Sequence, residues 1–122
     1  MKALLGLLFL TALFSPSLEQ FQTSYTSWLS NMPGEAVFNL NDFTALLGSS
    51  NYQGKHVFVA CILQTCPTCK GAQPMYTDAA NRLAEQYPGK VAFISVDSYK
   101  ARDFNVQYGV KKVPTYMLFE GE

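Results

Sequence analysis

The feature that most constrains this sequence is the continuous apolar run "HVFVACIL" at residues 56–63. A run of this length, composed largely of strand-favouring residues and lacking polar alternation, is typical of a strand buried on both faces of a sheet. Such a sheet needs helices on both sides. The run therefore predicts an α/β domain with a central sheet that is at least partly parallel.

Strand and helix patterns alternate along the rest of the chain. Strands are expected also at residues 36–40, 91–96 and 115–119, and helices at 41–47, from the cysteine motif to 87, and at 101–108. Asn41 or Asp42 is the expected N-cap of the first of these helices, and Gly48 its end. We find no internal repeat and no sign of a second globular domain, so residues 35–122 are expected to form one domain.

Residues 1–17 are predicted to be a signal peptide. Lys2 precedes the run "LLGLLFLTALF", and Ser17 is a small residue suited to cleavage. A membrane-spanning helix needs about 20 apolar residues, so the shorter run is typical of a secretory signal; the alternative is an uncleaved anchor. Removal of the signal would leave the chain off the membrane, in an oxidising compartment such as the endoplasmic reticulum lumen, the exterior or a bacterial periplasm.

Residues 18–34 are predicted to be an N-terminal helical extension. Apolar side chains recur there at spacings of three and four until Pro33-Gly34 ends the pattern. We expect this stripe to pack on the chain's own domain. A partner-binding or membrane-surface helix is the alternative, although Glu19 is the stretch's one charge, unlike a basic interfacial helix.

The overall charge excludes one class of partner. The 122 residues have a formal net charge of zero, and Lys111-Lys112 is the largest basic cluster, so nucleic acid is not an expected partner. Three cysteines are too few for a disulfide-stapled scaffold. They fit one exchangeable pair with a spare thiol.

The pair Cys66 and Cys69 could hold a metal, close a structural disulfide, or exchange disulfides. A structural zinc site needs four ligands, and adding Cys61 still leaves the set one short. His56 is expected to be a strand-end polar residue, so no metal site is predicted. A disulfide across three positions would close too short a loop to stabilise the fold much.

The position of the pair favours exchange chemistry. Cys66 is expected to start a helix directly after a buried strand, where unpaired N–H groups and the helix dipole favour a thiolate. Cys69, one turn further on, is expected to be shielded and to act second. Cys61 lies within the apolar run and is expected to be an inert buried thiol.

The stretches "VFVACILQTCPTCKGAQP", "VAFISVD" and "YGVKKVPTYMLFEGE" resemble the thioredoxin superfamily. The resemblance covers residues 36–122, and "QPMYTDAANRLAEQYPG" is most similar to domains of the protein disulfide isomerase type. Its specific pieces are the cysteine pair, Pro74, and Val113-Pro114-Thr115. The motif dipeptide Pro67-Thr68 is similar to that of some periplasmic thioredoxin-like reductases.

The resemblance implies a fold, a reaction and a set of site residues. It implies a mixed sheet flanked by helices, with Pro114 in a cis bond that faces the pair. It also implies that bound peptides pair with the backbone of Val113. Cys66 and Cys69 would then exchange disulfides with protein or peptide substrates through a mixed disulfide on Cys66, without any further cofactor.

Three departures from the family pattern limit this expectation. Thr65 stands where the family usually has Trp, and Ala60 where it usually buries an acid that moves the proton of the second cysteine. The sequence stops at Glu122, before the family's last edge strand and closing helix, so the domain is expected to be C-terminally incomplete. The alternative function is therefore a redox-slow peptide-binding or chaperone module.

Overall fold

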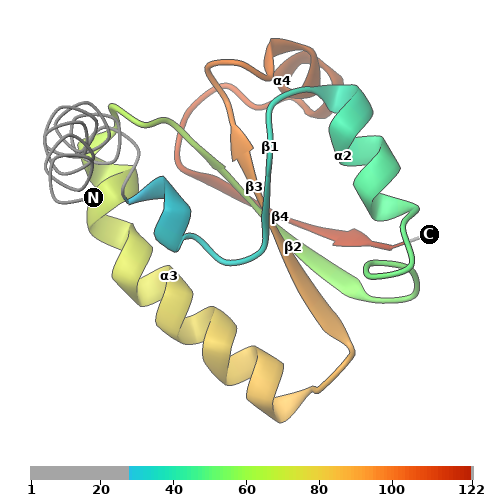
Figure 1. Ribbon diagram of the computed structural model, residues 1–122. Coiled ribbons are helices and arrows are strands. Elements are labelled where there is room, and N and C mark those ends of the chain that lie inside the picture. The colour runs from blue at the N-terminus through green and yellow to red at the C-terminus, as the bar shows by residue number, and fades with distance from the viewer. Residues whose placement is uncertain (1–27, 122) are drawn as a thin grey trace, which may run out of the picture.

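The computed structural model describes residues 28–121. Figure 1 shows a central sheet with helices on both sides. The elements, in chain order, are η1 (Leu29–Asn31), β1 (Glu35–Val37), α2 (Leu40–Leu47), β2 (His56–Ile62), α3 (Pro67–Gln86), β3 (Val91–Asp97), α4 (Arg102–Tyr108) and β4 (Thr115–Glu120).

The sheet is mixed, and its strand order is β1-β3-β2-β4. The strands β1, β3 and β2 are parallel, and β4 runs antiparallel to β2. The buried run that dominates the sequence forms β2, which pairs on both sides and is therefore interior to the sheet. The predicted α/β fold with a mixed sheet flanked by helices is confirmed.

The helices α2 and α4 cover one face of the sheet (Figure 1). Their core is aromatic: the ring of Phe43 contacts those of Phe104 and Phe119 edge-on, with centroids 4.8 and 5.0 Å apart. Phe43 and Phe104 are completely buried. Because α2 and α4 are short, these large rings supply much of the apolar surface that holds them on the sheet.

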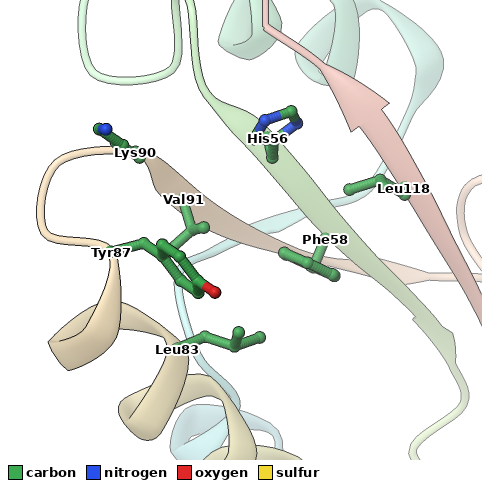
Figure 2. Close-up of a pocket in the computed structure, with 7 residues that line it drawn as sticks. All are labelled: His56, Phe58, Leu83, Tyr87, Lys90, Val91 and Leu118. Atoms are coloured by element: carbon green, nitrogen blue, oxygen red, sulfur yellow. The ribbon is translucent and has the colours of Figure 1, made fainter.

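The other face is covered by the long helix α3, and more fully at one end than at the other. An open pocket of about 310 Å³ lies beside the C-terminal end of this helix, and Figure 2 shows the residues that line it. Its lining includes Leu83 and Tyr87 of the helix end and Phe58 and Leu118 of the sheet. At 1.5 Å per residue the helix is about 30 Å long, so this pocket lies far from the cysteine pair at the other end.

The first helix begins earlier than predicted, and the expected cap at Asn41 or Asp42 is wrong. The N-cap is Asn39, whose side-chain oxygen accepts a hydrogen bond from the Asp42 N–H at 2.8 Å. Leu40, predicted to end the strand, is the first helical residue, so β1 stops at Val37. An apolar residue after a capping Asn fits a helix start as well as a strand end.

Only the end of the predicted N-terminal helix falls within the described residues. There the chain forms the short 3₁₀ turn η1 rather than an α-helix, and Gly34 follows with φ of +78°. The predicted signal peptide at residues 1–17 and the helix predicted for residues 18–27 lie outside the described residues. Within residues 28–121, no helix is both long and apolar enough to cross a membrane.

Candidate active site

Cys66 is the N-cap of α3. Its backbone is extended, with φ of −89° and ψ of 108°, and its N–H donates to the carbonyl of Leu63 at 3.2 Å just beyond the end of β2. Pro67 takes the first helical position, where a missing N–H costs no hydrogen bond. The expected placement of Cys66 between a buried strand and a helix start is confirmed.

The sulfur of Cys66 caps the helix. It accepts a hydrogen bond from the backbone N–H of Cys69, with 3.1 Å between sulfur and nitrogen. The Cys66 side chain is partly exposed, and its neighbours Pro67 and Thr68 are exposed. An N–H donor and a helix N-terminus both favour negative charge, so the accessible sulfur sits where a thiolate is stabilised.

Cys69 differs from Cys66 in exposure, as expected. Its side chain is only 2% exposed. Burial raises the pKa of the Cys69 thiol from 9.0 to about 11, and the hydrogen bond and negative charge of Cys66 add to that rise. Both cysteines are free thiols in this structure. The pair therefore combines an accessible sulfur with a shielded one that holds its proton firmly.

Val113 and Pro114 are brought to the pair by the loop before β4. The bond between them is cis, as the resemblance implies. Val113 packs against the same buried cluster as Cys66 and Cys69. Val113 therefore packs on the cluster that contains Cys69, although the two residues lie in segments far apart in the sequence.

Ala60 lies on β2 in the same cluster and is fully buried. In place of a carboxylate, two tyrosines lie on this face. The rings of Tyr76 and Tyr116 stack with centroids 5.2 Å apart. The Tyr76 hydroxyl is buried and has no hydrogen-bond partner among the described residues, and burial raises its pKa to about 12. A phenol that titrates so high is a poor base near neutral pH.

Trp28 is a member of the site that the sequence did not reveal. Its position in the apolar stripe of residues 18–34 predicts a place on a helix, but its ring is buried in the cluster with Cys69, and its indole N–H donates to the carbonyl of Gln64 at 3.0 Å. The two residues are 36 positions apart. Nothing in the local pattern around Trp28 indicates a contact across that distance.

Cys61 lies apart from the pair, in the core under α2 and α4. It is fully buried, and burial raises the pKa of its thiol to about 11.

His56 lies at the start of β2 and faces Glu120 of β4, with 2.8 Å between ring nitrogen and carboxylate oxygen. Within residues 28–121, no group of three or more His, Cys, Asp or Glu side chains could hold a metal ion.

Residues 36–122 match the family model described as thioredoxin. The chain belongs to the thioredoxin family. The superfamily resemblance is thereby confirmed, and it extends over the residues from which it was inferred.

Similar thioredoxin-family proteins include chloroplastic thioredoxin M2 of Arabidopsis thaliana, 36% identical over 56 residues that make up 46% of this chain and 28% of the relative. Protein disulfide-isomerase A6 of Mus musculus is 34% identical over 55 residues, 45% of this chain and 12% of that protein. The chain thus spans less than a third of the length of these two relatives.

Solved thioredoxins share the fold. The oxidised form of mitochondrial thioredoxin 3 from Saccharomyces cerevisiae superposes with a TM-score of 0.57 at 27% identity. The superposition covers 81% of this chain and 80% of the yeast chain. The thioredoxin Mala s 13 of Malassezia sympodialis gives a TM-score of 0.59 at 21% identity, covering 75% and 76% of the two chains, and shows the shared fold alone.

Proposed function

We propose that this thioredoxin-family chain is a thiol–disulfide oxidoreductase that acts on protein substrates through Cys66 and Cys69. The observation that carries the proposal is the hydrogen bond from the Cys69 N–H to the Cys66 sulfur at the start of α3. This bond stabilises negative charge on the accessible Cys66 sulfur. Cys69, the second sulfur, is buried and stays protonated.

The reaction proceeds in two exchanges. The Cys66 thiolate attacks a substrate disulfide, forms a mixed disulfide, and releases one substrate sulfur as a thiolate. Cys69 then loses its proton and attacks the Cys66 sulfur, which releases the second substrate sulfur. Two electrons pass from the pair to the substrate, whose two sulfurs take up two protons. The reverse sequence oxidises a substrate dithiol.

Substrate recognition is assigned to the surface beside the pair. Val113 lies in contact with the cluster that holds both cysteines, and Thr65, Pro67 and Thr68 are exposed around Cys66. An extended peptide that pairs with the backbone at Val113 would present its sulfur to Cys66. Thr65 offers little apolar surface, so backbone pairing rather than a large hydrophobic contact would supply most of the affinity.

The proposed setting is the secretory pathway, with substrates of the kind that protein disulfide isomerases act on. The signal-like pattern of residues 1–17 and the similarity to protein disulfide-isomerase A6 support this setting. It predicts a mature N-terminus near Leu18 in the native host. Intact mass measurement decides, because a purified native protein that retains Met1 would exclude cleavage.

The test of the exchange function is trapping of substrates. The Cys69→Ser variant should accumulate mixed disulfides on non-reducing gels, because the resolving thiol is gone, and the Cys66→Ser variant should accumulate none. The Cys61→Ser variant is the matched control and should behave as wild type. Equal trapping by Cys66→Ser and Cys69→Ser would contradict the assigned roles.

The second candidate function is a redox-slow peptide-binding or chaperone module. The observation in its favour is Ala60, since Cys69 has a raised pKa and no carboxylate beside it at this position. Binding of an unfolded, cysteine-free peptide separates the two functions. Affinity unchanged by Cys66→Ser, together with negligible turnover of a disulfide substrate by wild type, would favour the module.

A further inference from the structure

The segment from Trp28 to Met32 crosses the cysteine site from a distant part of the sequence. Trp28 is 6% exposed and Met32 is 8% exposed. Both lie in one apolar cluster with residues of the strand end, the cysteine motif and the loop before β4: Ala60, Ile62, Cys66, Cys69 and Val113. The segment therefore forms part of the wall behind the two thiols.

One end of this segment holds the loop that carries Cys66. The indole N–H of Trp28 donates to the carbonyl of Gln64, with 3.0 Å between nitrogen and oxygen. Gln64 stands between the end of β2 and the N-cap. A buried or half-buried carbonyl that loses its donor is costly, so this bond restrains the path of the chain into Cys66.

The other end of the segment holds the helix. The backbone carbonyl of Asn31 accepts hydrogen bonds from Gln73 and Thr77 of α3, at 3.3 and 3.1 Å. The same short segment thus joins the loop before Cys66 to the helix that carries Cys69. Geometry between the two sulfurs depends on how that loop and that helix are placed relative to each other.

We propose that Trp28 is a positioning residue of the thiol pair: its N–H holds the Gln64 carbonyl, and its ring packs in the apolar cluster that contains Cys69. The inference rests on the proposed exchange function and adds to it a residue from outside the thioredoxin match. Trp28 acts through Gln64 and the neighbouring packing, and it takes no part in the sulfur chemistry itself.

The test is the equilibrium of the pair with glutathione, in which the Cys66–Cys69 disulfide and two glutathione thiols give the dithiol and glutathione disulfide. The variant Trp28→Phe keeps an aromatic ring and loses the N–H. A looser loop weakens the Cys69 N–H bond to the Cys66 sulfur, so the dithiol loses stability relative to the disulfide. The equilibrium constant for reduction should fall by about fivefold, the factor that one net hydrogen bond represents.

The matched control is Tyr52→Phe. Tyr52 is also 6% exposed and also donates to a backbone carbonyl, that of Phe93 at 3.2 Å, but it belongs to the core under the other helices. This variant should leave the glutathione equilibrium unchanged while losing similar stability. A Trp28→Phe equilibrium equal to wild type, or an equal shift in both variants, would overturn the proposal.

Thr77→Val and the alkylation of Cys69 test the same role of Trp28 in two other ways. If Trp28→Phe does not fold, Thr77→Val, which loses a bond to the Asn31 carbonyl, must shift the equilibrium in the same direction. If the wild-type pair does not equilibrate with glutathione, the exchange function fails, yet alkylation of Cys69 in a Cys66→Ser background still tests Trp28. In that background, Trp28→Ala should raise the alkylation rate of Cys69 several-fold, and Tyr52→Ala should leave it unchanged. The proposal would be overturned if the two variants were alkylated at the same rate.

Discussion

Ala60 of β2 lies directly opposite Tyr116 of β4, and the Tyr116 ring stacks on Tyr76 of α3. A small side chain and two phenols thus fill the face of the sheet behind Cys69. Burial raises the pKa of Tyr116, and the charges of Cys69 and Cys66 raise it further. The ring is therefore near enough to sense the charge of both thiols.

A carboxylate introduced at Ala60 should speed the second exchange. The variant Ala60→Glu places a base in the cluster that contains Cys69, and general-base catalysis contributes at least about 10²-fold in favourable cases. The substitution should also lower the free energy of unfolding by a few kcal/mol, roughly the cost of a buried polar group that lacks full hydrogen bonding. Stopped-flow kinetics of attack and resolution, with urea unfolding, measure both effects.

The matched control for that change is Ala60→Gln, which has nearly the same shape and cannot take a proton. It should share the loss of stability and show no gain in the rate of resolution. If a folded Ala60→Glu protein resolves its mixed disulfide at the wild-type rate, another group or water already moves the Cys69 proton.

Resolution in the wild-type protein should depend steeply on pH. Burial is the largest cause of the raised pKa of Cys69 and persists in the mixed disulfide, so the thiolate that attacks it is a small fraction at neutral pH. Below that pKa the thiolate fraction, and with it the resolving rate, should grow about tenfold per pH unit. Single-turnover kinetics between pH 7 and pH 10 test this, and a rate that levels off by pH 8 would contradict it.

Alkaline pH should destabilise the fold through Cys61. Its thiol ionises near 9.0 when exposed and at about 11 when buried, because burial disfavours the charge. The pKa is higher in the folded state, so this contribution is complete below pH 9 and is lost as pH rises toward 11. The loss is on the order of 3 kcal/mol, and Cys61→Ala should remove that part of the pH dependence. Urea unfolding at several pH values compares the slopes; identical slopes would refute the assignment.

Gly34 should tolerate no side chain. Its φ is +78°, and an added Cβ would lie 1.7 Å from the carbonyl oxygen of Phe93 in β3. Gly89 has a similar φ of +73° with nothing within 4 Å of the added atom. Gly89→Ala should therefore cost about 1–2 kcal/mol, the strain of the left-handed conformation alone, and Gly34→Ala more than about 4 kcal/mol. Thermal unfolding checks both, and equal losses would refute the clash.

Much of the fold follows from local pattern. The run at 56–63 predicts the central strand because a strand buried on both faces leaves no polar positions, and Cys66 is correctly placed at the helix start because a strand pattern ends just before it. The predicted boundary is wrong at Asn39 and Leu40, because the local sequence allows these two residues either to end the strand or to cap and begin the helix. The element existed as predicted, and its boundary was decided by one hydrogen bond.

The two cysteines of the site could be predicted from the sequence, but most of the residues that pack around them could not. The spacing of Cys66 and Cys69 within three positions identifies the pair, and the family resemblance adds Val113 and Pro114. The contact between Trp28 and Gln64, like that between Tyr76 and Tyr116, joins segments distant in sequence and depends on how helices pack. The spacing of apolar residues predicts which face of a helix or strand is buried, but not which distant residue packs against it.

Trp28 is the one tryptophan of the 122 residues, and its ring lies against the cluster that contains both sulfurs of the pair. The intrinsic fluorescence of the protein therefore has a single indole source, placed in the apolar cluster that contains Cys69. We expect oxidation, reduction and mixed-disulfide formation each to change the surroundings of that indole. Each step can then be followed by the emission intensity of the unlabelled protein. Excitation at the red edge of the absorption spectrum excites the indole and not the nine phenylalanines or the seven tyrosines.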